Sequence, residues 1–391
     1  MLTRSEPASE SWGVLEDEVL EQLSRGIQAG RFSGAACAVA IAGEPAAELY
    51  LGTQAMWRGA LERINVEEQG PVTPDTMFDL ASVTKVFTAH AALSLADAGV
   101  VELDAPIAAA LPAYRDGERS RVTLRKLLSH TSGLPAEWVG WREPLARQLE
   151  SGPSGAPFTS TPPTGREALI ADLLATPLEA PAGTRFMYSS VNYNITMSYL
   201  EAVTGRRWRE LVQEYTLGPL GLSGVTADPE PALTAATEYQ PEFNRGVVHG
   251  VVHDEAAWSL GGAAGNAALF ATARGLLRFA EQLRVGSGRV LGRWMWDDAL
   301  TPMLGRATAS PEGGFGSSLG LRIGDAEFMG ATATMRGHTG FTGTSLLFDR
   351  DTQVSVVLLT NRVHPSRDRG GLQPLRTAIA DLAVAAARAG R

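Results

Sequence analysis

Residues 78–104, FDLASVTKVFTAHAALSLADAGVVELD, contain a motif that indicates both the fold and the chemistry of this chain. Their apolar pattern predicts a helix that begins near Ser82 and ends near Gly99. Ser82 and Lys85 are three residues apart, so both project from one face of that helix and an amine lies beside a hydroxyl. A neutral amine can activate a hydroxyl, and the free N–H groups of a helix N-terminus stabilise negative charge that develops next to it.

The rarity of lysine singles out Lys85. The chain has two lysines, Lys85 and Lys126, and arginine supplies its other basic residues. A desolvated lysine can lose its proton whereas arginine stays charged, so a site that needs a base can use lysine but not arginine. Lys126 has no nucleophile at helical spacing and is interpreted as a solvated lysine.

Three further segments follow in order: VTLRKLLSHTSGLP (122–135), PAGTRFMYSSVNYN (181–194) and RGHTGFTGTSLLFD (336–349). Together with the first stretch they resemble the serine beta-lactamase and penicillin-binding-protein superfamily. Within it they are most similar to the branch that holds class C beta-lactamases, D-alanyl-D-alanine carboxypeptidases and related esterases. The resemblance covers about residues 14–385 and is specific for fold and reaction type, although not for the substrate.

The resemblance implies roles for the first two motifs. Ser82 would be the acyl-accepting nucleophile and Lys85 its proton partner. Tyr188 begins a Tyr-Ser-Ser element similar to the family's Tyr-x-Asn, in which the phenol shuttles a proton to the leaving group. Ser190 stands where many relatives have asparagine, so it offers a hydroxyl to substrate instead of an amide. Whether Asn192 compensates is left open by the sequence, and we interpret Asn192 as structural.

The third motif is His338-Thr339-Gly340, which resembles the Lys-Thr-Gly or His-Thr-Gly of the family's edge strand and would bind substrate. The resemblance implies an oxyanion hole made by the backbone N–H groups of Ser82 and Phe341. An imidazole is mostly neutral at pH 7, unlike the lysine that many relatives carry here. Substrates without a carboxylate, such as simple esters, are therefore not disfavoured, although carboxypeptidase-like relatives also carry histidine.

Short apolar or alternating segments near both ends of the chain predict strands. Residues 34–42 and 46–51 are separated by a Gly-Glu-Pro turn signal, and residues 344–349 and 353–360 repeat the pattern across Arg-Asp-Thr. These segments predict one antiparallel sheet assembled from the two ends of the chain.

Together with the predicted strands, the helical patterns predict an α+β fold. This fold is an antiparallel sheet flanked by N- and C-terminal helices, with an inserted, mostly helical domain. The terminal helices are predicted near residues 14–23 and 372–388. The predicted sheet domain is discontinuous and comprises residues 1–75 and 301–391, and the inserted domain comprises residues 76–300. The cleft between the two would bring the three motifs together.

Composition excludes several other classes of protein. The chain has 391 residues and a net charge of -9, which opposes binding to nucleic acid. Cys37 is the single cysteine, so neither an intrachain disulfide nor a cysteine-rich zinc site can form, and its apolar surroundings predict a buried side chain. The N-terminus lacks the features of a signal peptide and no apolar run reaches about 18 residues, so a cytoplasmic protein without a membrane span is expected.

A different mechanism is suggested by Gly316–Gly320, which matches the G-x-S-x-G nucleophile elbow with Ser318 at its centre. An elbow requires a strand before the serine and a helix after it, followed by an acid and a histidine. Asp349 and Asp351 do precede His364, but the flanking segments do not fit and too little chain remains for that fold. Ser82 is therefore preferred over Ser318.

Other conspicuous residues receive structural interpretations. His249, His253 and Asp254 have near-metal spacing, but the sequence shows no helix-borne acidic partner nearby, so no metal site is assigned. His130 is interpreted as a histidine that fixes its loop. Gly261–Gly265 lack the strand, lysine and spacing of a phosphate site and are assigned to backbone packing.

The sequence therefore predicts a serine hydrolase that cleaves a small-molecule ester, amide or lactam through an acyl-enzyme on Ser82, without metal or cofactor. An intracellular, esterase-like enzyme is the preferred reading, with a D-alanyl-D-alanine carboxypeptidase or class C-type beta-lactamase as the alternative. A catalytically silent penicillin-fold module that only binds ligands is the alternative of another class. Which of Lys85 and Tyr188 is the base in each step is left open.

Overall fold

The computed structural model describes residues 2–4, 10–151, 157–299 and 314–390. Its main feature is an eight-stranded antiparallel sheet, built from both ends of the chain as predicted, with strand order β1-β3-β2-β13-β12-β11-β10-β9. The strands are β1 (Leu2–Arg4), β2 (Gly34–Ile41), β3 (Glu44–Gly52), β9 (Gly316–Ser317), β10 (Arg322–Ile323), β11 (Arg336–Thr339), β12 (Ser345–Asp349) and β13 (Val354–Thr360).

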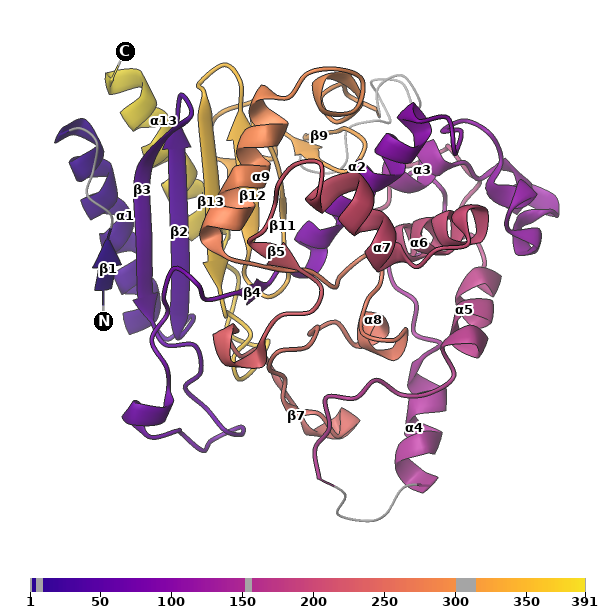
Figure 1. The fold of residues 1–391 in the computed structure, drawn as a ribbon, viewed down its shortest axis with the longest axis horizontal. Coiled ribbons are helices and arrows are strands. Elements are labelled where there is room, and N and C mark those ends of the chain that lie inside the picture. Colours follow the sequence, from indigo (N-terminus) through magenta and orange to yellow (C-terminus); the bar gives the residue numbers. More distant parts are fainter. Residues whose placement is uncertain (1, 5–9, 152–156, 300–313, 391) are drawn as a thin grey trace.

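Alternating residues of the central strands face two separate hydrophobic cores. In β2, Cys37 and Val39 pack with the terminal helices α1 (Glu10–Gln28) and α13 (Gln373–Ala389), whereas Ala36 and Ala38 belong to the core on the other face. Side chains in a strand point to opposite faces in turn, so a sheet buried on both faces reads as a continuous apolar run. Figure 1 shows α1 and α13 on one side of the sheet and α9 on the other.

Cys37 is buried as predicted, with none of its surface exposed. This burial raises the pKa of its thiol to about 12. The side chain therefore behaves as a small apolar residue of the sheet core.

The described chain between β3 and β9 contains more helix than strand. Its helices are α2 (Thr84–Asp97), α3 (Leu124–Leu128), α4 (Arg142–Ser151), α5 (Arg166–Ala175), α6 (Ser190–Thr204), α7 (Trp208–Val212), α8 (Glu255–Ser259) and α9 (Ala273–Val285). The short elements are β4 (Phe78–Asp79), β5 (Val225–Thr226), β6 (Tyr239–Gln240), β7 (Gly246–Val247), β8 (Phe270–Ala271) and, after β10, α12 (Ala326–Met329). No helix among the described residues is long and apolar enough to cross a bilayer.

Two details differ from the simplest sequence expectation. Helix α2 begins at Thr84 and is preceded by a 3-10 turn, Ala81–Val83, so Ser82 lies in the turn and Lys85 in the helix. Helix α9 packs on β2, β12 and β13 although it lies within residues 76–300. The division into domains at residues 75 and 301 stays a prediction, and residues 300–313 lie outside the described part of the chain.

Candidate active site

The first motif forms a direct contact between hydroxyl and amine. Lys85 Nζ lies 2.8 Å from Ser82 Oγ and 3.4 Å from the carbonyl oxygen of Asn266, and it donates to both. The Lys85 side chain has no exposed surface, because α2 is buried on nearly all sides, whereas Ser82 is partly exposed in a cleft. At 2.8 Å a proton can pass between the hydroxyl and the amine.

A strained residue precedes the serine and orients it. Ala81 has a φ of 44°, in the left-handed region that alanine rarely adopts. The buried carboxylate of Asp79 accepts from the N–H of Ala81 at 2.7 Å and from the N–H of His253 at 2.6 Å. Burial raises the pKa of the Asp79 carboxyl, and these donors partly oppose that effect. Asp79 therefore holds the backbone turn that presents Ser82.

Tyr188 lies next to the first motif. The centre of its ring is 5.2 Å from Lys85 Nζ, 5.5 Å from the guanidinium carbon of Arg322 and 5.9 Å from the centre of the His338 ring. A lysine, an arginine and an imidazole thus surround a partly exposed phenol. A phenol this close to the first motif is placed where a proton shuttle would act.

His130 fixes the loop that carries Tyr188. Its Nδ1 lies 3.1 Å from the backbone nitrogen of Ser189, and its carbonyl oxygen accepts from the Met187 N–H. These contacts agree with the interpretation of His130 as a structural histidine. Asn192 is also buried, 1% exposed, where it contacts Ser132 and His130. Asn192 is therefore structural, while Ser190 lines the cleft, and its role in binding substrate stays a prediction.

The third motif lies at the end of a strand and forms the wall of the site on the side of the sheet. Strand β11 ends at Thr339, and the turn that follows is tied to the segment before Ser82. The Thr342 hydroxyl donates to the Asp79 carbonyl at 2.6 Å, and the Thr344 hydroxyl donates to the Leu80 carbonyl at 3.0 Å. Among the described residues the N–H of Phe341 has no hydrogen-bond acceptor. This N–H is therefore free to donate to a molecule bound in the cleft, which Phe341 lines.

His338 is neutral in this environment. Its side chain is 4% exposed, and its Nδ1 lies 2.8 Å from the Thr339 carbonyl oxygen. Burial lowers the pKa of its imidazole to about 3, and the positive charges of Lys85 and Arg322 contribute. The sequence predicts a neutral imidazole at pH 7. Because its pKa is lowered to about 3, the imidazole also stays neutral well into the acidic range.

The three motifs line one cleft of about 470 Å³, which Ser82, Tyr188, Ser190, His338, Thr339, Gly340 and Phe341 share. Sequence reasoning missed four arginines that also line it, Arg322, Arg362, Arg367 and Arg376. No motif marks these arginines, because they come from separate segments that only the folded chain brings together. Arg322 pairs with Asp325 at 2.6 Å, whereas Arg376 donates only to carbonyl oxygens and to Gln373.

Ser318, the centre of the alternative elbow, does not meet the requirements of a nucleophile. It has no exposed surface, and a bend leading to strand β10 follows it instead of a helix.

The family model for beta-lactamases matches residues 18–381, most of the chain. The chain belongs to the beta-lactamase family. This is a family of serine hydrolases, so the chain is a beta-lactamase-family hydrolase, in agreement with the resemblance carried by its motifs. Its fold class, a sheet with flanking helices, is also confirmed by the solved structures that it resembles.

One curated relative and two solved structures illustrate the range of the family. The relative, from Escherichia coli K12, is named "Putative D-alanyl-D-alanine carboxypeptidase" and is 30% identical over 328 residues, which cover 76% of this chain and 72% of the relative. EstCE1, a hydrolase with promiscuous acyltransferase activity, has a TM-score of 0.72 at 21% identity, covering 96% of this chain and 100% of EstCE1. A class C beta-lactamase has a TM-score of 0.68 at 18% identity, covering 97% of this chain and 99% of the beta-lactamase.

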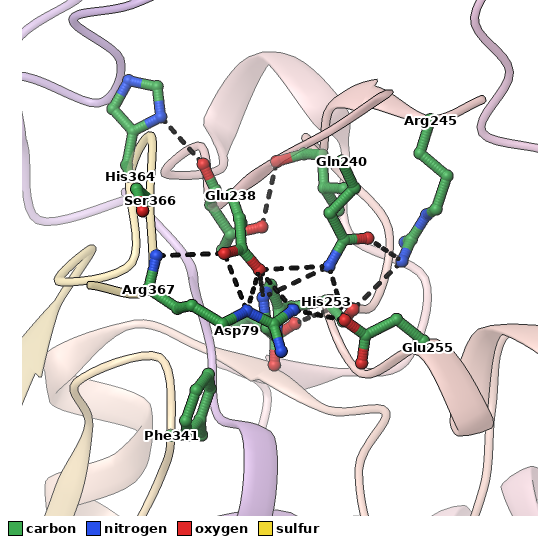
Figure 2. A network of polar contacts seen from close by, with 12 residues as sticks. Asp79, Glu238, Gln240, Arg245, His253, Glu255, Phe341, His364, Ser366 and Arg367 are labelled. Carbon is green, nitrogen blue, oxygen red and sulfur yellow. Dashed lines mark hydrogen bonds and ion pairs between the residues drawn. The ribbon is translucent and has the colours of Figure 1, made fainter. Parts of the chain in front are cut away.

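A polar network behind Phe341 supports one wall of the hydrolase's cleft (Figure 2). His253 Nε2 lies 2.9 Å from Glu238, and Arg367 pairs with both Glu238 and Glu255. Burial raises the pKa of Glu238, but the donors from His253 and Arg367 outweigh this effect and hold that pKa well below its usual range. The ring of His253 stacks on Phe341 with centroids 5.7 Å apart.

The same network corrects one sequence argument. Glu255 lies on α8 beside His253, so the expectation that His253 has no helix-borne acidic partner is wrong. Potential ligand atoms of Glu238, His253 and Glu255 lie within 4.8 Å of one another. The guanidinium of Arg367 already pairs with both carboxylates, so these residues fit an internal ion pair better than a cation site. His249 is not part of this group and contacts the Thr234 carbonyl.

Buried histidines predict that the hydrolase loses stability in mild acid. Burial lowers the pKa of His90 and of His364 to about 4 and that of His338 to about 3. An unfolded histidine has a pKa of about 6.5. Below that pH the unfolded chain binds protons that the folded chain does not, so each histidine lowers the free energy of unfolding by about 1.4 kcal/mol per pH unit. Above pH about 6.5 these histidines do not change the free energy of unfolding.

Urea unfolding at pH 7.5 and pH 5.5 measures this effect, with His90→Gln as the matched variant. Glutamine keeps a polar partner for the Thr216 hydroxyl, which lies 3.1 Å from His90 Nδ1. Between pH 7.5 and pH 5.5 the free energy of unfolding is expected to fall less in the variant than in the unchanged protein. The difference equals the contribution of the one proton that His90 binds in the unfolded chain. Asp79, whose raised pKa acts in the opposite sense, is the same in both proteins. Equal losses in both would contradict the prediction.

Proposed function

We propose that this hydrolase cleaves carboxylic esters through an acyl-enzyme on Ser82. The contact of 2.8 Å between Ser82 Oγ and Lys85 Nζ carries this proposal. Ser82 Oγ attacks the ester carbonyl while its proton passes to Lys85, and the backbone N–H groups of Ser82 and Phe341 hold the oxyanion. The C–O bond to the alcohol then breaks, and Tyr188 delivers the proton to the departing oxygen. Water attacks the acyl-enzyme by the reverse proton path and releases the acid.

The preference for esters rests on His338. A lysine at this position would offer a permanent cation to a substrate carboxylate, whereas the buried imidazole is neutral because its pKa is lowered to about 3. Nothing at this position therefore requires a carboxylate in the substrate. The cytoplasmic location expected from the sequence stays a prediction alongside this one.

A second candidate, a D-alanyl-D-alanine carboxypeptidase or a beta-lactamase, is favoured by the arginines of the cleft. Arg322, Arg362 and Arg376 line it together with the third motif, and guanidinium groups bind carboxylates well. The curated relative at 30% identity carries the carboxypeptidase name. Against this candidate, Arg322 is already paired with Asp325, and the guanidinium of Arg362 donates to three backbone carbonyls.

Covalent labelling and a substrate comparison test both candidates. We expect a fluorophosphonate to add one label, which peptide mapping places on Ser82 and not on Ser318. We expect kcat/KM for p-nitrophenyl butyrate to exceed the values for nitrocefin and for a peptide ending in D-Ala-D-Ala by at least about tenfold. Fast turnover of nitrocefin or of the peptide would transfer the assignment to the second candidate. No label on Ser82 would favour a ligand-binding module without catalytic activity.

A further inference from the structure

Two buried arginines from other parts of the chain hold the turn that carries Phe341, residues 340–344. Arg362 follows strand β13 and Arg376 lies on helix α13, and they are 9% and 6% exposed. In the described part of the chain both donate to carbonyl oxygens and to one side-chain amide, and neither pairs with a carboxylate. A buried charge without a counter-charge is unfavourable unless its hydrogen bonds satisfy it, so those bonds indicate what the arginines do.

Arg376 contacts the peptide unit that contains the Phe341 N–H. Its Nη2 donates to the carbonyl oxygen of Gly340 at 3.3 Å and to that of Thr344 at 2.9 Å, so one nitrogen joins the two ends of the turn. The Gly340 carbonyl also accepts from the Gly343 N–H at 3.1 Å. This carbonyl and the Phe341 N–H belong to one planar trans peptide unit, in which they point in opposite directions. Donors at the carbonyl therefore fix the direction of the N–H.

Arg362 holds the next peptide unit and the ring of Phe341. Its Nε and Nη2 donate to the Phe341 carbonyl oxygen at 3.2 and 2.8 Å, and its guanidinium carbon lies 4.9 Å from the centre of the ring. Its Nη1 donates to the carbonyl oxygens of Arg367 and Gly370, in the segment before α13. Guanidinium groups therefore hold the peptide units on both sides of the Phe341 Cα.

The turn is also joined to the segment before Ser82, through the hydroxyls of Thr342 and Thr344. The two N–H groups of the proposed oxyanion hole thus lie on segments that contact each other. We propose that Arg362 and Arg376 are positioning residues that keep the Phe341 N–H directed at the oxyanion. This inference rests on the proposed acyl-enzyme.

The positive charges strengthen the donor as well as orient it. Burial lowers the pKa of Arg376 to about 10, and the charge of Arg362 contributes, so Arg376 is still protonated at pH 7. Charged donors form stronger hydrogen bonds than neutral ones, and hydrogen bonds in a chain polarise one another. A guanidinium at the Gly340 carbonyl therefore makes the Phe341 N–H a better donor to a negatively charged oxygen.

The same hydrogen bonds distinguish positioning from the binding of a substrate carboxylate. A guanidinium has five N–H donors, and Arg362 uses four of them on backbone carbonyls. Arg376 Nε is buried and has no acceptor among the described residues, so this nitrogen is not accessible to a substrate. The donors of the two arginines are therefore directed mainly at the turn.

Methionine and lysine variants of both arginines test the proposal in the full-length protein. Methionine removes the charge and the donors, whereas lysine keeps a charged donor without the planar fork. We expect kcat and kcat/KM for p-nitrophenyl butyrate to fall together at least about tenfold in Arg362→Met and in Arg376→Met, with KM changed less than about twofold. The reason is that the oxyanion forms in acylation and in deacylation but not in the bound substrate. Each lysine variant should be at least about threefold faster than its methionine counterpart.

Inhibition by butylboronic acid provides a readout that a merely structural role would not change. The Ser82 oxygen bonds to the boron while its proton passes to Lys85, and the tetrahedral anion that results resembles the transition state. The inhibition constant should rise at least about fivefold in both methionine variants. Arg350→Met is the matched control and should change neither kcat nor the inhibition constant, because its guanidinium also donates to three backbone carbonyls but does not line the cleft.

Urea unfolding shows whether each variant folds. Where methionine prevents folding, glutamine, which keeps a donor without the charge, takes its place with the same expected loss. Unchanged kcat and unchanged inhibition in the folded variants of both arginines would overturn the inference while the ester hydrolase stands. A loss confined to mono-4-nitrophenyl adipate, which carries a carboxylate, would also overturn it, because the arginines would then bind substrate. An unchanged protein with no activity and no label on Ser82 would overturn the proposed function itself.

Discussion

Replacing Ser82 by alanine is expected to lower kcat/KM for p-nitrophenyl butyrate at least about 10⁴-fold, since groups that act as one catalytic unit show losses of this size. Lys85→Met is expected to cost at least about 10³-fold, because the Ser82 hydroxyl then has no amine to take its proton. Methionine has a similar length and is apolar, so it fits a position with no exposed surface.

The double variant tests whether the two residues act together. Because Ser82 Oγ and Lys85 Nζ are 2.8 Å apart and share one proton path, Ser82→Ala with Lys85→Met should be no slower than the serine variant alone. Lys126→Met, the change of the other lysine, is the matched control and should keep full activity. Additive losses, or a serine variant that retains more than a tenth of the activity, would contradict the assignment.

The second large effect is expected from Gly340→Ala. A Cβ on this residue would lie 2.1 Å from Thr344 Oγ1 and 2.4 Å from the Leu80 carbonyl oxygen. The threonine side chain can rotate, but the carbonyl belongs to the backbone just before Ser82, so the turn that carries Phe341 must move away. The Phe341 N–H would then no longer reach the oxyanion, and loss of one such donor costs about 10²–10³ in kcat.

This loss should appear in kcat more than in KM, because the oxyanion forms only after the carbonyl is attacked. Gly13→Ala is the control, since no atom lies within 4 Å of its added Cβ and alanine suits helix α1. Both proteins should give normal circular dichroism spectra. A Gly340→Ala enzyme with unchanged kcat would show that the oxyanion hole is formed elsewhere.

The local features of the site could be anticipated from sequence because each is encoded within a few residues. The spacing of Ser82 and Lys85 predicts that the hydroxyl and the amine project from the same side of one helical segment. The continuous apolar run around Cys37 likewise predicts a strand with a buried cysteine. The exact start of α2 was misplaced by two residues, because the strain at Ala81 comes from bonds to Asp79 and not from local preference.

The family, the order of the motifs and the sheet made from both ends of the chain were all determined by the sequence alone. Tertiary structure alone decided the arginines of the cleft, the partners of Glu238 and the pocket that Asn266 lines. Asp254 and Asn266, for example, line one pocket with Glu137 and Trp141, which lie more than a hundred residues earlier in the chain. Local patterns determine which residues are helical, extended or buried, whereas the surface around a substrate depends on which distant segments pack together.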